Sequence, residues 1–164
     1  MLSSRIWSQA TREGLDNLML SVDSNILLYA FNASAPWHRQ ADAFLRSLDS
    51  REDVVISELV LVELYTLLRN PAVVDRPLSA SEAVGVVTAY RTHPHWRLEG
   101  FPADGLRLHD SLWKRARNDG FARRRIYDAR LALSLLEQGV LEFATANASD
   151  FRDFPFQRVW SPLT

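Results

Sequence analysis

Cysteine is absent from this chain of 164 residues. Disulfide bonds, thiolate zinc sites and a cysteine nucleophile are therefore excluded. Long apolar runs are absent too, since none approaches the roughly 20 residues that a membrane-spanning helix needs. Residues 1–18 are polar and charged and lack the apolar core of a signal peptide. These absences predict a cytoplasmic protein with no membrane segment.

Lysine is almost absent. Lys114 is the only lysine, and every other basic side chain is an arginine. The planar guanidinium suits phosphate binding, although the base composition of a genome produces the same bias, and we favour that explanation. The formal net charge is −1, so a nucleic-acid partner would have to meet a local positive patch. The serine elbow GxSxG and the phosphate-binding P-loop are also missing.

The composition is that of a folded domain. Hydrophobic residues make up 47% of the chain and charged residues 24%, as in ordinary globular proteins, and the length fits one domain. The tripeptide Met-Leu-Ser occurs at 1–3 and again at 19–21. We predict one domain over residues 19–164. The leader, residues 1–18, is interpreted as disordered, as a surface helix, or as the product of a start assigned upstream of Met19.

Short apolar runs alternate with segments of helical spacing. The expected strands lie at 18–22, 54–57, 96–101, 140–147 and 157–164, and the expected helices at 38–48, 58–70, 79–93, 105–118 and 128–138. Residues 25–31 are expected only to lead out of the first strand. Strands that alternate with helices of this length predict an α/β fold, with a parallel sheet covered by helices on both faces.

Asp23 and Asn25 interrupt the apolar stretch LMLSVDSNILLYAF at the end of the first predicted strand. Ligands of open α/β sheets bind beyond the carboxyl ends of the strands, so Asp23 is a candidate site residue. A helix cap or a turn explains it equally well. Glu63 falls on an apolar helix face, where a carboxylate is either buried with an arginine partner or lies at the edge of a cavity.

Two further acidic positions follow later in the chain. Asp128 begins an apolar helix, where complementarity to the helix dipole is the alternative to a site. Asp150 and Asn147 lie in the turn after the strand segment VLEFAT, residues 140–145, and a structural Asx turn explains them equally well. The predicted fold nevertheless brings all four carboxylates to one edge of the sheet.

Clustered carboxylates repel one another, and a hard divalent cation such as Mg²⁺ or Mn²⁺ relieves that repulsion. Such a cation activates water for attack on a phosphodiester. The run Arg123, Arg124 and Arg125 precedes Asp128 and would hold a nucleic-acid backbone. A solvated charge run or a site for an acidic protein explains these arginines equally well.

Four segments in this order, VDSNILLYAF, ISELVLVELYTLLRNP, IYDARLALSLLEQGV and FATANASDF, resemble the PIN-domain ribonucleases of the VapC toxin type. The resemblance covers residues 19–163. It implies a three-layer α/β/α domain with a central, mostly parallel sheet, a Mg²⁺- or Mn²⁺-dependent endoribonuclease activity, a homodimer, and inhibition by a cognate VapB-like antitoxin, with which a higher assembly is compatible.

The resemblance also implies roles for single residues. Asp23, Glu63, Asp128 and Asp150 would be the catalytic acids, and Asp23 and Asp128 would hold the metal. The supporting side chains would be Asn25, Thr145 and Asn147. Because Asn147 stands where many members carry an aspartate, Asp150 becomes the fourth carboxylate and one firmly held ion is expected. The alternative function is a catalytically weak module of the same fold that binds RNA or a partner.

Overall fold

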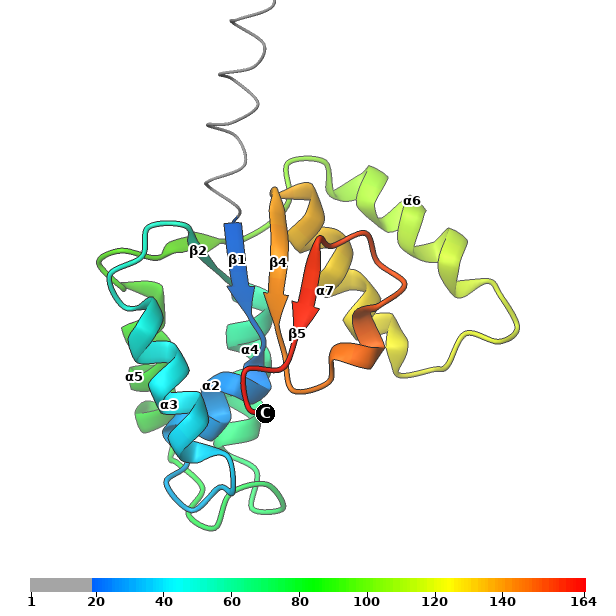
Figure 1. Cartoon of the computed structure of the whole chain (residues 1–164). Coiled ribbons are helices and arrows are strands. Elements are labelled where there is room, and N and C mark those ends of the chain that lie inside the picture. The colour runs from blue at the N-terminus through cyan, green and yellow to red at the C-terminus, as the bar shows by residue number, and fades with distance from the viewer. Residues whose placement is uncertain (1–18) are drawn as a thin grey trace, which may run out of the picture.

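The computed structural model describes residues 19–164 and is organised around one sheet (Figure 1). The strand order is β3-β2-β1-β4-β5. The strands are β1 (Met19–Val22), β2 (Val54–Ser57), β3 (Arg97–Glu99), β4 (Val140–Ala144) and β5 (Arg158–Trp160). Every neighbouring pair is parallel, so all five carboxyl ends meet at one edge of the sheet. The prediction of a parallel α/β sheet is confirmed.

Helices connect the strands and cover the sheet. They are α2 (Ser24–Phe31), α3 (His38–Leu48), α4 (Glu58–Leu68), α5 (Ala80–Arg91), α6 (Gly105–Ala116) and α7 (Arg125–Glu137), with a short 3-10 helix η1 (Ala148–Phe151). In Figure 1, α2, α3 and α5 lie on the left and α6 and α7 on the right. The three-layer α/β/α arrangement that the resemblance implies is confirmed.

Local sequence signals explain several helix boundaries. The Ser57 side chain caps α4 by accepting a hydrogen bond of 3.2 Å from the amide of Leu59. Ser79 and Glu82 form a reciprocal capping box at the start of α5. Gly139 follows α7 with φ at +85°, a backbone conformation that glycine adopts without strain. The predicted stop of this helix at Gly139 is confirmed.

Helix α2 corrects one prediction. The expectation that residues 25–31 only lead out of the first strand is wrong, because Ser24–Phe31 is helical. Ile26, Leu27 and Leu28 are all buried, since α2 packs against both α3 and α4. A helix covered on several sides has no polar face, and its sequence therefore lacks the periodicity that marks an amphipathic helix.

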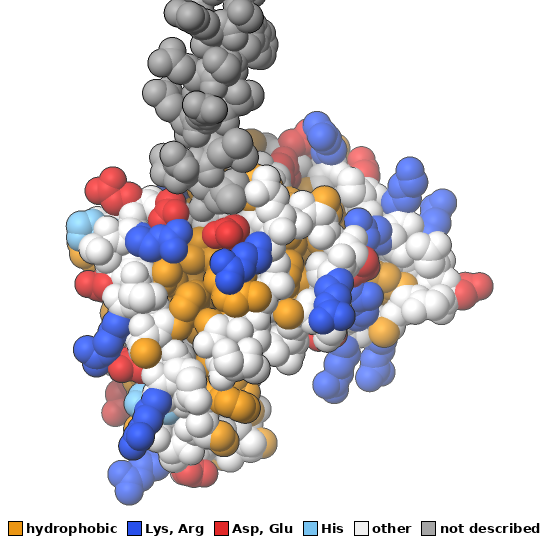
Figure 2. All heavy atoms as spheres, viewed as in Figure 1, with side chains coloured by type: hydrophobic (Ala, Val, Ile, Leu, Met, Phe, Trp, Pro, Cys, Tyr) orange, Lys and Arg blue, Asp and Glu red, His pale blue; other side chains and the backbone are white. Residues whose placement is uncertain are grey.

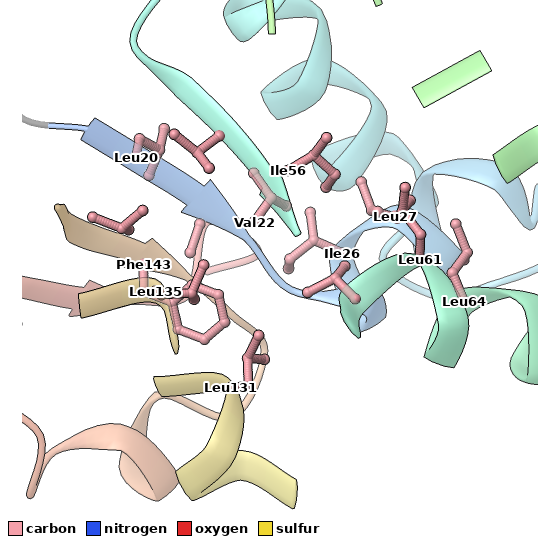
Figure 3. Close-up of a cluster of buried hydrophobic side chains, with 14 of the residues drawn as sticks. Leu20, Val22, Ile26, Leu27, Ile56, Leu61, Leu64, Leu131, Leu135 and Phe143 are labelled. Atoms are coloured by element: carbon pink, nitrogen blue, oxygen red, sulfur yellow. The ribbon is translucent and has the colours of Figure 1, made fainter. Parts of the chain in front are cut away.

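The hydrophobic core joins the sheet to the helices on either side (Figure 3). Side chains of β1, β2, α2 and α4 meet in one part, and side chains of β4 and α7 meet in the other. The labelled members are Leu20, Val22, Ile26, Leu27, Ile56, Leu61, Leu64, Leu131, Leu135 and Phe143. This packing fixes the ends of β1, α4, α7 and β4, from which the candidate site residues project.

The predicted leader, residues 1–18, lies outside the described residues. From residue 19 onwards, the chain contains no helix with both the length and the apolar character needed to cross a membrane.

Candidate active site

Asp23 stands where β1 ends and α2 begins. Its side chain is buried, with 6% of the residue exposed. Oδ1 accepts a 2.8 Å hydrogen bond from the backbone amide of Ser24 and thereby caps α2. The two interpretations of Asp23, helix cap and site residue, are therefore compatible: one carboxylate oxygen serves the helix, and the other faces the neighbouring strand end.

The second oxygen of Asp23 belongs to a network that joins β1 to β4. Val22 and Ala144 are paired in register, so the residues that follow them are neighbours. The Thr145 hydroxyl donates to Asp23 Oδ2 at 2.7 Å. Asn25 Nδ2 donates to the same oxygen at 3.3 Å, and its Oδ1 accepts from the amide of Ala146 at 3.1 Å. Two side chains, Thr145 after β4 and Asn25 in α2, thus orient one carboxylate oxygen.

The electrostatic environment of Asp23 disfavours its charged form. Desolvation by burial raises the pKa of Asp23 to about 6, the hydrogen bond from Thr145 opposes that rise, and the negative charges of Glu63 and Asp128 add to it. Desolvation and neighbouring acids are the features by which a carboxylate site differs from an exposed surface acid. The structure therefore brings Asp23, Glu63 and Asp128 close enough for their charges to interact, as the sequence analysis predicts.

Glu63 and Asp128 line the same cleft, which has a volume of about 480 Å³ and runs between α4 and α7. Glu63 is exposed, and no ion pair to it occurs within residues 19–164. Glu63 is therefore not a buried acid paired with an arginine but lies at the edge of a cavity. Asp128 is half-buried. Burial raises its pKa, Asp150 and Glu63 raise it further, and Arg125 lowers it. Asp150 is thus close enough to Asp128 for its charge to raise the pKa of Asp128.

Asp150 and Asn147 belong to the turn after β4. Asp150 is exposed on η1. Asn147 is exposed too, and its backbone amide donates to Thr145 Oγ1 at 3.1 Å. The side chain of Asn147 makes no hydrogen bond with any residue in the described range. The turn therefore leaves Asp150 facing the acidic cluster and ties Asn147 to it through the backbone.

Comparison with known proteins agrees with this fold and with the order of its motifs. The PIN domain model matches residues 20–156. The chain belongs to the PIN domain family. It is 49% identical over 146 residues to Ribonuclease VapC24 of Mycobacterium tuberculosis, a match that spans 89% of this chain and 98% of that protein. The resemblance to VapC-type PIN domains drawn from the sequence is confirmed.

Solved structures with the same fold include two further proteins of this type. One is VapC20 of M. tuberculosis, described as a toxin that cleaves the sarcin-ricin loop, with a TM-score of 0.60 and 23% identity over 82% of this chain and 95% of that one. The other is VapBC2 of Rickettsia felis bound to a promoter DNA fragment, with a TM-score of 0.61 and 16% identity over 88% of this chain and 98% of that one. At these identities the likeness concerns the fold.

The donor set of this PIN domain suits a hard cation. Within residues 19–164, no three acidic or histidine side chains already converge as a complete ligand set. Mg²⁺ commonly takes one or two carboxylates and keeps several waters, so a pair such as Asp23 and Asp128 would be enough. Both carboxylates have raised pKa values, caused first by burial, and a bound cation would offset that cost. The residues fit the metal predicted from the sequence.

Basic side chains gather on the side of the molecule formed by α6, α7 and the loop between them (Figure 2). Arg123 and Arg124 are exposed, and Arg124 lines the cleft. Arg125 differs from both, because its Nη2 donates to the backbone carbonyl of Asp150 at 2.7 Å and to Asp153 at 2.8 Å. Two of the three predicted backbone-binding arginines are therefore available to a ligand, and the third stabilises the turn.

Sequence reasoning did not identify the residues that support this turn or the aromatic residue beside Asp128. Arg125 pairs with Asp153, and the guanidinium of Arg115 lies 4.5 Å from the ring centre of Phe154. Tyr127 is 70% exposed and lines the cleft. The long-range pairings leave no pattern in the local sequence. Tyr127 could have been identified as a site residue, because it directly precedes the candidate acid Asp128.

Proposed function

We propose that this PIN domain is a Mg²⁺-dependent endoribonuclease and the toxin of a type II toxin–antitoxin system. The observation that carries the proposal is the buried carboxylate of Asp23, which has a raised pKa, is oriented by Thr145 and Asn25, and is coupled to Glu63 and Asp128. The 49% identity to a protein named a ribonuclease supports the reaction class.

Asp23 and Asp128 would hold Mg²⁺, and Glu63 and Asp150 would be the further acids of the site. When bound, Mg²⁺ generates a nucleophile from water and offsets charge on the phosphate in the transition state. Thr145 and Asn25 keep the Asp23 carboxylate in one orientation, so little reorganisation is needed during the reaction. Asn147 supports Thr145 through its backbone amide.

Arg123 and Arg124 bind the RNA backbone. Both are exposed beside the N-terminus of α7, the helix that carries Asp128. Contacts of this kind position a nucleic acid without reading its sequence, and they weaken as salt rises. Arg125, engaged with Asp150 and Asp153, acts on the reaction through the turn that it holds.

A VapB-like antitoxin is the proposed protein partner. The solved relatives include VapBC complexes from Rickettsia felis and from Salmonella typhimurium, each bound to DNA, and FitAB bound to a DNA fragment. A homodimer, extended to a higher assembly with antitoxin, is the proposed state of the chain. A cytoplasmic location, predicted from the sequence, completes the proposal.

One observation favours the alternative of a catalytically weak module that binds RNA or a partner. No three acidic or histidine groups between residues 19 and 164 converge as a finished ligand set. A pure binding module gains no stability from Mg²⁺, whereas binding to the native state raises the melting temperature. A metal titration monitored by thermal melting therefore separates the two functions.

Induced expression in a bacterial host tests the biological role. The wild-type chain is expected to arrest growth and to generate new RNA ends, whereas Asp23→Asn is expected to do neither. The matched control is Asp110→Asn, which alters an exposed acid on α6 outside the cluster. Equal growth of wild type and Asp23→Asn, at equal expression, contradicts a toxin.

A further inference from the structure

Tyr127 is an exposed aromatic side chain beside the acidic cluster. It is 70% exposed and directly precedes Asp128 in the first turn of α7. None of the described residues donates a hydrogen bond to its hydroxyl or accepts one from it. The ring therefore presents a free aromatic face to the cleft that Glu63 and Asp128 line.

Two helix faces form this cleft. Leu59, Val62, Glu63 and Thr66 come from α4, and Arg124, Tyr127, Asp128 and Leu131 come from α7 and its N-cap. Each set is spaced i, i+3, i+4, i+7, which is one face of a helix. On each face an acid stands next to apolar side chains. The cleft thus combines an acidic part with an apolar part.

The apolar part is open to a ligand. Val62 is 65% exposed although it faces the cleft, so the wall opposite Tyr127 is not filled by the protein's own core. Arg124 and Arg130 also line the cleft, both are exposed, and neither forms an ion pair within residues 19–164. An aromatic wall with cationic groups at its margin is complementary to an aromatic ligand that carries negative charge.

A nucleotide within a single strand has this chemistry. Its base stacks on aromatic side chains whatever its identity, and its phosphates attract arginine. Since Asp128 adjoins Tyr127, a base on that ring places its own phosphate near the acidic cluster. An apolar segment of a protein partner would fill the apolar wall but would leave Arg124 and Arg130 without anionic partners.

We infer that the α4–α7 cleft is a nucleobase subsite in which one unpaired base of the substrate stacks on Tyr127 while the adjoining phosphates meet Arg124 and Arg130. The inference rests on the proposed ribonuclease function and adds a base-binding residue to it. A base that is paired in a helical stem cannot stack on Tyr127, so the subsite takes an unpaired base. Tyr127 is a binding residue, and the acids remain responsible for the chemistry.

The test compares the binding of two short single-stranded RNAs to the full chain in EDTA, where no cleavage occurs. One carries mixed bases, and the other is abasic throughout but has the same phosphates. Wild type is expected to bind the base-containing strand more tightly, and Tyr127→Ala to weaken that binding by roughly 5- to 100-fold while leaving the abasic strand unaffected. Tyr127→Phe keeps the preference because it keeps the ring.

Trp113→Ala is the matched control, since Trp113 is 60% exposed on α6 and does not line the cleft. It is expected to leave the base preference unchanged. Arg124→Ala weakens both strands equally, because it contacts phosphate. The subsite is overturned if wild type binds both strands equally, if Tyr127→Ala keeps the preference, or if Trp113→Ala loses it. The same conclusion follows if only a protein partner, and no RNA, depends on Tyr127.

Failure of the subsite and failure of the proposed function are distinguishable. RNA cleavage with Mg²⁺ but no base preference means that the function stands and the subsite does not. A base preference lost in Tyr127→Ala, without any metal-dependent cleavage by wild type, means that the subsite stands on a binding module. Thermal melting of each variant checks its folding, which an exposed position such as Tyr127 is expected to preserve.

Discussion

The Thr145 hydroxyl donates a 2.7 Å hydrogen bond to the carboxylate of Asp23, a residue 122 positions earlier in the chain. Both groups are buried, and each directly follows a strand residue that is paired with the other strand. The parallel register of β1 and β4 therefore determines the orientation of the most buried acid in the site. That relationship leads to the first prediction.

Thr145→Val is expected to reduce the free energy of unfolding by about 1–3 kcal/mol, because it removes a buried hydrogen bond to a carboxylate. Asn147 also loses the acceptor of its amide. Since the Thr145 hydrogen bond lowers the pKa of Asp23, the variant is expected to bind metal only at higher pH than wild type. Urea denaturation and metal titration across pH measure both effects. Thr145→Ser is the control, and an unchanged pH dependence in Thr145→Val contradicts the role.

Asp23→Asn is expected to stabilise the metal-free protein in a pH-dependent way. The folded pKa of Asp23 is about 6, above the usual aspartate value of 3.8, so protonation favours the folded state. The stabilising contribution of the protonated form is complete below about pH 4 and is lost as pH rises through 6. At neutral pH the charge costs on the order of 3 kcal/mol, which asparagine does not incur.

Urea denaturation in EDTA at about pH 4 and about pH 8 measures this difference. The stability gained by Asp23→Asn is expected to be small at the lower pH and large at the higher one. A gain that is the same at both values means that the burial of Asp23 does not disfavour its charge. The comparison of the two proteins at one pH cancels the titration of the acids that do not interact with Asp23, which leaves out Glu63 and Asp128.

Magnesium is expected to raise the melting temperature of wild type at neutral pH and to do so much less near pH 5. Protons compete with the metal for Asp23 and Asp128, whose pKa values are both raised. Saturation at about 100 times the dissociation constant corresponds to a stabilisation of about 2.7 kcal/mol. Calorimetry with and without Mg²⁺ measures the shift. Asp128→Asn is expected to abolish it, and an undiminished shift in that variant excludes Asp128 as a ligand.

Arg125→Ala is expected to slow RNA cleavage without weakening RNA binding. Arg125 donates to the carbonyl of Asp150 and to Asp153, and its charge lowers the pKa of Asp128. Its loss frees the turn that carries Asp150 and moves the pH profile of the reaction to higher pH. Arg123→Ala is the matched control, in which KM rises and the pH profile stays in place. The reverse pattern contradicts a positioning role for Arg125.

Local signals in the sequence account for the elements that were predicted well. Strand β2 and helix α3 have their predicted ends because a run of buried β-branched residues and an amphipathic repeat define them. Helix α2 was not predicted, because a helix buried on several sides shows no periodicity. The sequence did indicate its capping residue, Asp23, but an aspartate at this position is equally compatible with a helix cap and with a site residue.

The candidate site was predictable to the extent that strand register is predictable. Asp23 and Thr145 follow strands whose carboxyl ends any parallel sheet brings to one edge, but their direct contact requires β1 and β4 to be neighbours, which the structure shows. The pairing of Arg125 with Asp153 depends instead on the path of a turn between η1 and β5, which no periodicity encodes. The sequence alone therefore could not show that Arg125 stabilises the turn while Arg123 and Arg124 remain exposed.

Cleavage of RNA by the purified chain, with Mg²⁺ and with EDTA, tests the central claim most directly. Wild type is expected to cut single-stranded RNA only with the metal. Asp23→Asn and Asp128→Asn are each expected to lose this activity while keeping or gaining thermal stability. Metal-dependent cleavage that persists in both variants contradicts a reaction carried by the carboxylate cluster.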